Sequence, residues 1–587
     1  MFRKKKTALT VASVASAALI VSACANGDSD SVGVGFEDCD ENPTTCNEGE
    51  AVDGDEIVWA LDSGWASWSE VHTDYGQASG DVLEAVYPEA GYFDQDAEWH
   101  YNEHIYSAEP ELVNEDPMQV EYYLNPEGTW GDGTRISVDD FIYNWYAWSG
   151  NEDYCNELCS PRSAGYGPHV DDIEETEEDV ITITYRDGYQ NPEWMFATVL
   201  TNPAHLAEEY GFEDWQDDPE VMGESLENFV TTTPEYSAGP YKIVDAEMND
   251  YVSLEINEEY DGAVQPTISN IRLEFIESTA SIITELRQGT IHGASPGRFD
   301  PDDLDALEGE QGIRYDVADG PGWAHLDLNM ENQFLQDFDL RHAIFVAYNL
   351  EEILDRTTRM QQEDSERVQN FFFVNDDDMG DDIFADSDQG SGDMEAARSI
   401  LEDADYEWDD NETLLTPEGD EVELEYRLPT EGDNSQVQAE LFQSWMGELG
   451  INVELNSFGD GELNDVLADG TYDVINFQWL TTPTFATSPQ QLFGTGSGSN
   501  FGGYSNDEFD DLADQVLGTV DMDEAAQHAN DAARVLAEDA YVLPMSAVPA
   551  IIMIDENLVN VRDNWASQQR ALYNMAEWGW NADDAED

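Results

Sequence analysis

Alternating apolar and polar residues predict a series of strands in the first half of the chain. The pattern is typical of strands with one buried face, and turn-forming residues separate the stretches. It occurs in "EIVWAL" (56–61), "MQVEYYL" (118–124), "DVITITYR" (179–186), the hairpin-like 240–257 that turns at Asn249–Asp250, and "NIRLEFIE" (270–277). A helix is expected directly after the last of these strands, in "TASIITELRQG".

In the second half the pattern switches between strand and helix periodicity. Strands are expected in "EVELEYRL" (421–428), "INVELNSF" (451–458) and "YDVINFQWL" (472–480), separated by helices in "SQVQAELFQSWMGELG" and "GELNDVLADG". A β-α-β-α-β order with short connections builds a parallel sheet, and ligands of such sheets bind beyond the carboxyl ends of the strands. Two more helices, in "NDEFDDLADQVLG" and "DEAAQHANDAARVLAEDA", and a strand in "YVLPMSAV" (541–548) follow.

The last strand of that unit opens a long stretch without charge. Residues 474–506 contain no Asp, Glu, Lys or Arg, although charged residues make up 26% of the chain. Desolvating a carboxylate is costly, so a neutral stretch is suited to a wall that closes over a ligand. The alternative interpretation is a merely buried strand followed by a glycine-rich loop. Residues with suitable aromatic, amide or hydroxyl groups are Asn476, Phe477, Gln478, Trp479, Thr481, Thr482, Phe485, Asn500 and Tyr504.

The composition is globular, and the charge is extreme. With 587 residues, 41% hydrophobic residues and 16 Trp, the chain is long enough for at least two domains. It has 130 acidic and 21 basic residues, and Lys242 is the only lysine outside positions 4–6. Such a surface resembles that of proteins from molar salt, where the Debye length of about 3 Å screens the repulsion. The lack of a basic patch disfavours nucleic-acid binding.

The amino terminus predicts export and a lipid anchor. Basic residues precede a short apolar run, and Val21–Cys24 resembles a bacterial lipobox, in which the cysteine becomes the lipidated first residue. The alternative is an ordinary signal peptide. We predict a signal peptide over 1–23 and a lipidated acidic tether over 24–54, which places the protein on the outer face of the cytoplasmic membrane. No later segment is long and apolar enough to span a membrane.

The four remaining cysteines predict two local disulfides, because an exported chain meets an oxidising environment. Cys39 would pair with Cys46, and Cys155 with Cys159. A metal site is the rival interpretation, but no His or further Cys completes either spacing. We therefore predict neither a metal nor a cofactor.

Several segments in order resemble one family. "YYLNPEGTWGDGTRISVDDFIYNW" (122–145) is similar to a Trp-x-Asp-Gly-Thr segment of the family 5 extracellular solute-binding proteins, the oligopeptide- and dipeptide-type receptors of ABC importers. "SAGPYKI", "IITELRQGTIHG", "LDLNMENQFLQDFDLRHAIFVAYNLEEIL", "ARSILEDADY", "ELGINVE", "YDVINFQW", "SNDEFDDL" and "VLPM" follow in the family's order, so the resemblance covers about residues 55–565. We expect most of these segments to be scaffold, with Asp139 or Asp140 capping a helix.

The resemblance implies a two-lobed α/β fold of the type II periplasmic-binding-protein class, in its large form with an extra subdomain and mixed sheets flanked by helices. Lobe one would span 55–310, with the inserted subdomain at about 85–225, and would be completed by 545–587. Lobe two would span 311–544. The implied function is that of a monomeric, lipid-anchored receptor that binds an oligopeptide or similar small solute in a hinged cleft and delivers it to the permease and ATPase subunits.

The resemblance also bears on the ligand site. Trp65 and Trp68 follow the first strand and would face the cleft, and Trp323 lies near the crossover between the lobes. In the family's peptide binders an Asp shortly after the residue that corresponds to Trp479 pairs with the peptide amino group. Leu480, Thr481 and Thr482 stand there instead. Either another acid holds a peptide, or the ligand has no free ammonium group.

Enzyme activity is not indicated by any motif. The chain has no G-x-S-x-G, H-E-x-x-H or P-loop lysine motif, and its acidic clusters lack EF-hand spacing. One rival function is an extracellular hydrolase, because with 130 acidic residues a catalytic carboxylate pair cannot be recognised by spacing. The other is a regulatory lipoprotein on the same scaffold.

Overall fold

The computed structural model describes residues 35–36, 39, 42–72, 74, 76–87, 90–161, 166–196, 200–375, 377–430, 433–459 and 462–582. The predicted signal peptide and Cys24 lie outside the described residues. Within these ranges, no helix has the length and apolar character needed to cross a membrane.

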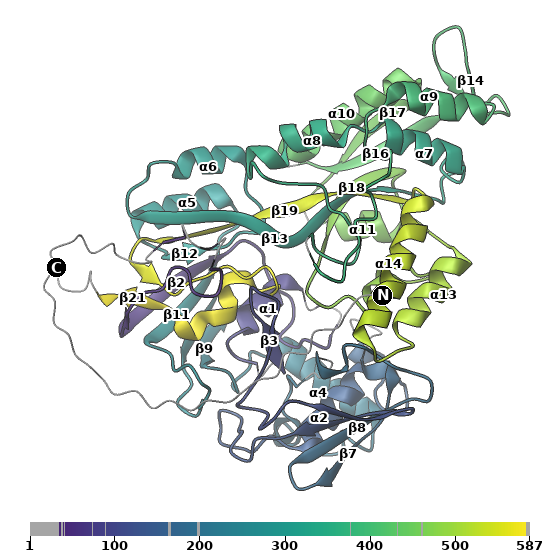
Figure 1. Ribbon diagram of the computed structural model, residues 1–587. Coiled ribbons are helices and arrows are strands. Elements are labelled where there is room, and N and C mark those ends of the chain that lie inside the picture. The colour runs from purple at the N-terminus through teal and green to yellow at the C-terminus, as the bar shows by residue number, and fades with distance from the viewer. Residues whose placement is uncertain are drawn as a thin grey trace, which may run out of the picture.

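A ten-stranded mixed sheet forms the centre of the molecule (Figure 1). Its strands, in spatial order, are β17 (Asn452–Phe458), β16 (Glu423–Pro429), β18 (Val474–Leu480), β13 (Ile313–Leu328), β19 (Val542–Asp555), β12 (Gly293–Ala294), β2 (Gly54–Leu61), β11 (Ile268–Phe275), β10 (Tyr251–Ile256) and β9 (Tyr241–Glu247). We call β12, β2, β11, β10 and β9 the β2 side of the sheet, and β17, β16 and β18 the β16 side. The long antiparallel strands β13 and β19 join the two sides.

The pairing of β13 with β19 breaks between Asp319 and Trp323. Pro549, which lacks an N–H donor, lies opposite Asp319 at this break, where a regular ladder hydrogen bond is not required. A side chain at Gly320 would place its Cβ 2.8 Å from the Val548 carbonyl oxygen, so the close approach of the two backbones requires glycine. The sequence predicted only 541–548 as a strand and none at β13. The structure extends β19 to Asp555 because the irregular segment accommodates the proline.

On the β2 side, β2 runs parallel to both β12 and β11, and β11, β10 and β9 form an antiparallel meander. Alternate residues of β2 enter two different cores. Ile57 and Trp59 belong to one core, and Val58 and Ala60 belong to the other, which lies beneath α5 (Thr279–Gln288). The predicted strands and helix of this region are confirmed. The C-terminal segment returns here, because β1 (Ala51–Val52), β21 (Gly579–Asn581) and β20 (Leu558–Val559) form a small sheet.

A separate unit, which we call the small-sheet subdomain, is drawn in blue at the bottom of Figure 1. Its antiparallel sheet has the order β5-β6-β8-β7 and is covered by helices. Every second residue of its strand β6 points into the core, as the sequence pattern predicted; these residues are Met118, Val120 and Tyr122. The elements are β5 (Glu111–Glu115), β6 (Met118–Tyr123), β7 (Val170–Glu177), β8 (Val180–Tyr185), α2 (Val138–Trp148), α3 (Ala204–Glu209) and α4 (Pro219–Thr231).

On the β16 side, the predicted β-α-β-α-β unit is confirmed. β16 pairs in parallel with both β17 and β18, and α10 (Asp433–Leu449) and α11 (Leu463–Ala468) make the connections. Gly450 follows α10 with a φ of 89°, a left-handed conformation that suits glycine and ends the helix. The two later predicted helices are α13 (Asp507–Val516) and α14 (Met522–Glu538), which pack against each other.

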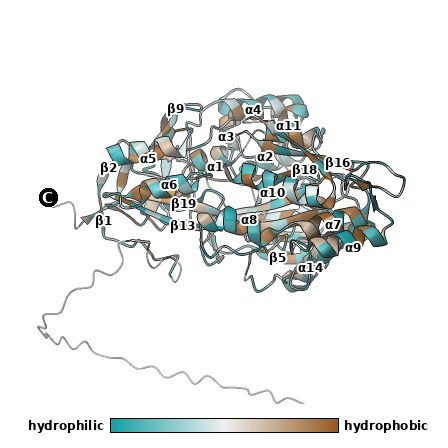
Figure 2. Cartoon of the chain, turned by 90° about the horizontal axis from the view of Figure 1, so that it is seen from above, coloured by the Kyte–Doolittle hydropathy of each residue, from teal (hydrophilic) through white to brown (hydrophobic). Residues whose placement is uncertain are grey.

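The remaining elements cover the sheets or connect these units. They are α1 (Gln77–Leu83), β3 (Gly91–Phe93), β4 (Trp99–Tyr101), α6 (Pro301–Leu307), α7 (Phe338–Ala347), α8 (Leu350–Arg356), α9 (Met394–Asp403), β14 (Glu407–Trp408), β15 (Leu414–Leu415) and α12 (Ser488–Phe493), with short 3-10 turns at Glu157–Cys159, Gly167–His169, Trp194–Phe196, Thr358–Met360 and Arg570–Glu577. Peripheral helices carry both hydrophobic and hydrophilic residues (Figure 2), as expected for helices with one buried face.

Both predicted disulfides are present. Cys39 is bonded to Cys46, and Cys155 to Cys159. The second disulfide is buried beside α4 in the small-sheet subdomain.

Candidate ligand cavity

A cavity of about 260 Å³ lies where the crossing strands break their register. It is lined from β13, β19, the end of β18, the loop 368–375 and the C-terminal segment. The lining residues are Asp319, Gly320, Gly322, Trp323, Val368, Asn370, Phe371, Phe373, Val374, Asn375, Thr481, Ala547 and Trp565. A larger hollow of about 490 Å³ lies over α5, but it is an open depression on exposed residues, and we assign no ligand to it.

The pairing of β18 with β13 brings two of the predicted site residues to the cavity. Trp323 lies opposite Trp479, and Gly322 lies opposite Leu480. Just beyond the strand end, the Thr481 N–H donates to the Pro321 carbonyl oxygen at 2.6 Å. Trp323 and Thr481, which are far apart in sequence, therefore meet at one wall, and Thr481 lies at the carboxyl end of a parallel strand as expected.

The loop 368–375 supplies the aromatic part of the lining. It is docked along β19 by the Val368 N–H, which donates to the Met545 carbonyl at 3.1 Å. Asn375 closes the loop, because its Oδ1 accepts from the Gln369 N–H and its Nδ2 donates to the Arg367 carbonyl, both at 2.9 Å. No periodic pattern in the sequence predicts this loop as part of a site. Its available signal is the run "NFFFVN", three adjacent phenylalanines without helical or strand periodicity.

Trp565 reaches the cavity from the C-terminal segment. Its Nε1–H donates to the Gln95 carbonyl at 2.9 Å, and the Gln95 side chain donates to the Asp563 carbonyl at 3.1 Å and to the Tyr573 hydroxyl at 2.7 Å. Gln95 belongs to the turn between β3 and β4. This hairpin therefore positions the Trp565 ring, a contribution that sequence reasoning missed because the residues are 470 positions apart.

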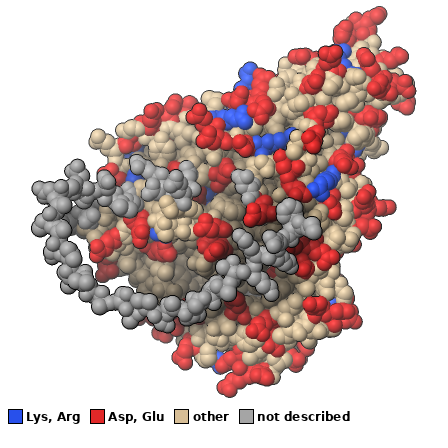
Figure 3. All heavy atoms as spheres, viewed as in Figure 1, with Lys and Arg blue, Asp and Glu red and all other residues tan. Residues whose placement is uncertain are grey.

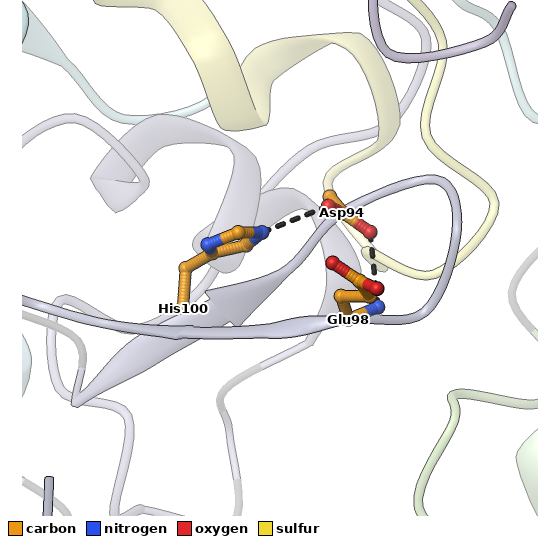
Figure 4. A group of neighbouring side chains, drawn as sticks. All are labelled: Asp94, Glu98 and His100. Atoms are coloured by element: carbon orange, nitrogen blue, oxygen red, sulfur yellow. Dashed lines mark hydrogen bonds and ion pairs between the residues drawn. The ribbon is translucent and has the colours of Figure 1, made fainter. Parts of the chain in front are cut away.

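The same hairpin carries Asp94, Glu98 and His100, whose ligand-type atoms lie within 4.8 Å of one another (Figure 4). One Asp94 oxygen accepts from the Asp96 and Glu98 N–H groups at 3.0 and 2.9 Å, and the other lies 2.8 Å from His100 Nε2. Both oxygens thus already hold the turn together. We assign the group a role in shaping the hairpin and no metal.

The electrostatics of the lining are simple. Asp319 is the only charged residue among the thirteen described residues that line the cavity. Its side chain is exposed, and none of the described residues forms a hydrogen bond or an ion pair with its carboxylate. The other polar groups are neutral amides and a hydroxyl. Asn370 is already satisfied, since its Nδ2 donates to the Asp381 carbonyl and its Oδ1 accepts from the Phe372 N–H, both at 3.0 Å.

Residues 106–501 match the family described as "Bacterial extracellular solute-binding proteins, family 5 Middle". The chain belongs to this family. The match covers more than half of the chain, including the loop 368–375 and the strand β18. Membership points to a binding protein rather than an enzyme.

Individual relatives of this family 5 protein match it over most of its length. It is 24% identical over 459 residues to the oligopeptide-binding protein OppA of Mycobacterium tuberculosis, covering 77% of this chain and 72% of the relative. Among solved structures, a periplasmic EDTA-binding protein, EppA, is 24% identical with a TM-score of 0.84, covering 92% of this chain and 99% of that one. The oligopeptide-binding protein AppA from Bacillus subtilis, in complex with a nonapeptide, is 15% identical with a TM-score of 0.70, covering 90% and 100%. These similarities confirm the predicted two-lobed α/β fold class.

In this solute-binding protein, other predicted residues lie beside the cavity. The Gln478 side chain is exposed, and its Oε1 would lie 3.4 Å from a Cβ at Gly322. Trp479 is half-buried and stacks on Phe501 with ring centroids 5.9 Å apart. Phe485 is buried, and its ring lies 4.7 Å from that of the lining residue Phe373.

The other two polar candidates on the strand and its end are engaged within the protein. The Asn476 amide donates to the Met545 sulfur at 3.4 Å, and the hydroxyls of Thr482 and Thr484 are 2.8 Å apart. Both Asn476 and Thr482 remain half-buried. Their contact with a ligand stays a prediction.

Asn500 and Tyr504 hold the glycine-rich loop together. The Asn500 Nδ2 donates to the carbonyls of Phe493, Gly494 and Tyr504. The Tyr504 hydroxyl donates to Asp539 at 2.8 Å, and burial raises the pKa of Tyr504. Neither residue lines the cavity, so we leave both out of the proposed site.

Trp65 and Trp68 belong to the first hydrophobic core. They are 2% and 1% exposed, and their rings meet edge to face at 5.8 Å. The Trp68 N–H donates to the Val230 carbonyl at 3.0 Å, which ties this segment to α4. They do not line the cavity, because the segment after β2 turns back into the core. The structure gives them a packing role, and we leave them out of the proposed site.

The family segment at 122–145 is scaffold, as the sequence analysis expected. Ser137 is the N-cap of α2, and the Asp140 carboxylate accepts from the Ser137 N–H at 2.9 Å and from the Ala204 N–H at 2.8 Å. Asp140 is therefore the reciprocal partner in a capping box rather than the cap itself. Burial raises its pKa to about 6.

Proposed function

We propose that this protein is an extracellular receptor that captures a small solute in the cavity between the two sides of the sheet. The observation that carries the proposal is the lining itself. The β16 side contributes Thr481, the crossing strands contribute Trp323 and Ala547, and Trp565 comes from the C-terminal segment that packs on the β2 side. A ligand held there touches both parts of the molecule, so binding is coupled to their relative position.

The hinge we propose is the register break of the crossing strands. Gly320 and Gly322 flank Pro321 on β13, and Pro549 interrupts the donor pattern of β19 opposite Asp319. Rotation at a few such residues lets lobe one (55–310 with 545–587) close on lobe two (311–544), as in hinged binding proteins. A solute that contacts both lobes favours the closed form by its difference in affinity for the two states.

The partners follow from family membership. Receptors of this family serve ABC importers, so we propose that the closed form docks on a permease with its ATPase subunits. The relatives named for oligopeptides support a short peptide or a molecule of similar chemistry as the ligand. We further propose that lipidated Cys24 anchors the monomer to the outer face of the cytoplasmic membrane. Replacing Cys24 by serine should then move the protein from the membrane fraction to the medium.

The direct test is mass spectrometry of small molecules released from protein purified in molar salt and then denatured. We expect one solute or one chemical class in near-stoichiometric amount. Adding that solute to stripped protein should raise the melting temperature in a concentration-dependent way. If the pure protein instead converts a peptide or oligosaccharide to products, it is a hydrolase and the receptor proposal fails.

A further inference from the structure

We propose that the solute carries a compact organic cation, an ammonium group on an apolar body, and that Asp319 is the residue that selects it. This inference rests on the proposed function and names its ligand class. Of the thirteen described lining residues, Asp319 is charged and none is basic. A cavity of this kind offers a counter-charge to a cation and repels an anion.

The aromatic lining supports the same ligand class. Four aromatic side chains surround the cavity: Trp323, Phe371, Phe373 and Trp565. Aromatic rings attract a cation through their quadrupole, most strongly where water is excluded, and they bury the alkyl groups of an ammonium compound at the same time. A neutral polar solute would instead need directed hydrogen bonds. The Asn370 amide, the most buried polar group of the lining, already uses both of its ends within the protein.

Asp319 is available for this role. Its carboxylate is exposed and has no hydrogen bond or ion pair to any described residue, so a ligand need not displace an internal partner. Its position at the register break, before Gly320, places it on the proposed hinge. When a ligand binds in the cavity beside this carboxylate, pairing with a cation compensates the water that the carboxylate loses.

The size of the cavity limits the ligand. About 260 Å³ lies just below the roughly 300–1,000 Å³ typical of drug-sized ligands. It accommodates a small ammonium compound or the amino-terminal residue of a short peptide, and not an extended peptide. The shared chemistry of these two sources is the ammonium group, and the experiment separates them.

The test is isothermal titration calorimetry in molar sodium chloride with two matched probe pairs. One pair is choline and its uncharged carbon analogue 3,3-dimethylbutan-1-ol. The other is dialanine amide and its N-acetylated, neutral form. We expect at least one cation to bind at least about tenfold more tightly than its neutral partner. A preference for choline indicates a free ammonium compound, and a preference for dialanine amide indicates a peptide amino terminus.

Two variants assign the preference to Asp319. Asp319→Asn should abolish the difference between cation and neutral partner. Asp305→Asn, which removes another exposed carboxylate, on α6 and outside the lining, should leave the difference unchanged. Equal binding of cation and neutral partner by the unmodified protein overturns the inference, as does a preference that survives in Asp319→Asn. A neutral or anionic solute released from the purified protein also overturns it, and leaves the receptor function intact. Absence of any bound or released solute contradicts the proposed function instead.

Discussion

The carboxylate of Glu193 accepts hydrogen bonds from the main-chain N–H of Phe485 at 2.5 Å and from that of Ala486 at 3.1 Å. Glu193 follows the small-sheet subdomain strand β8, whereas Phe485 follows β18. A second contact joins the same parts, because the Gln190 N–H donates to the Leu517 carbonyl at 3.3 Å near the end of α13. Figure 1 shows α13 and α14 directly above the small-sheet subdomain. Glu193 therefore connects the two parts that the proposed hinge would separate.

This contact favours a segment without further acidic residues around Phe485 and Ala486, which belong to the neutral stretch 474–506. Glu193 is 6% exposed, and burial raises the pKa of its carboxyl to about 7, while the two backbone donors act in the opposite direction. The titratable neighbour on its own segment is Tyr189, and its receiving segment carries no charged residue at all. A second carboxylate in 474–506 would add repulsion to a group that is already costly to ionise.

Glu193 should make lobe closure depend on pH. In the open form the carboxyl is hydrated, with an ordinary pKa of about 4.3, whereas in the closed form its pKa is about 7. The closed form therefore keeps a proton that the open form has lost. The free energy by which Glu193 favours the closed form is fully present below about pH 4.3 and is lost as the pH rises through about 7. Between pH 5 and pH 8, the titration of Glu193 should lower the ligand affinity measured by calorimetry by at least about tenfold.

The matched variant for this prediction is Glu193→Gln. Glutamine keeps an oxygen that accepts from the Phe485 N–H but does not titrate, so the difference between the two pH profiles isolates Glu193 from the other acids. Small-angle scattering should show the same difference in the closed fraction. If the profiles of the variant and the unmodified protein coincide, the contact does not respond to pH.

Gly320 should be intolerant of any side chain. An added Cβ would lie 2.8 Å from both the Val548 carbonyl oxygen and the Ala550 Cβ, so one of the crossing strands has to move. Overpacking of this kind costs about 1–3 kcal/mol. We expect Gly320→Ala to lower the free energy of unfolding by that amount in urea titrations. Gly498→Ala is the control, because nothing lies within 4 Å of its added Cβ, and it should stay within about 0.5 kcal/mol. Equal stability of the two variants would show that β19 yields without cost.

Trp565→Phe should weaken binding of the recovered solute without unfolding the protein. The substitution keeps an aromatic ring in the cavity but removes the Nε1–H that donates to the Gln95 carbonyl. Loss of one such hydrogen bond is worth about 0.5–1.5 kcal/mol, so the dissociation constant should rise by up to about tenfold. Trp408→Phe removes an equivalent bond, to the Leu449 carbonyl at 2.6 Å, outside the cavity lining. If both variants lower the affinity equally, the effect is general destabilisation.

The sequence predicted those parts of the fold in which a single periodicity persists over a whole element. Apolar and polar residues alternate, or apolar residues run together, in β2, β6, β8 and the strands from β16 to β18. Local signals also mark helix ends, as Gly450 does for α10. β13 was missed because Gly320, Pro321 and Gly322 predict a turn when considered alone. They form a strand because β19 supplies the pairing partner more than 200 positions later.

The cavity was predictable only in part, for a similar reason. Trp323 and Thr481 follow local signals, a Gly-Pro-Gly crossover and a strand end. Phe371 and Trp565 depend on a loop closed by Asn375 and on a tryptophan held by Gln95, and neither contact leaves a periodic trace in the sequence. For Trp65 and Trp68, residue type alone could not distinguish a cleft from a core, and the structure places both in the core.

The acidic surface should make folding depend on salt. Red Asp and Glu side chains are spread over the visible face in Figure 3 and outnumber the blue Lys and Arg, in line with the formal net charge of −109. At low ionic strength these charges repel over longer distances, which destabilises the compact state. We expect the melting temperature to fall by at least about 5 °C between 2 M and 0.1 M sodium chloride.

A charge-reduced variant separates repulsion from other effects of salt. Strand β7 exposes Asp171, Asp172, Glu174 and Glu177 within eight residues on the small-sheet subdomain, and its fifth exposed acid, Glu175, already accepts from the Asp179 N–H. Replacing all four by their amides removes local repulsion and leaves the inward residues Val170 and Ile173 in place. The variant should melt at a higher temperature than the unmodified protein in 0.1 M salt, and this gap should shrink in 2 M salt because screening already weakens the repulsion there. A gap that stays constant with salt would assign the effect to strand packing and contradict the role of repulsion.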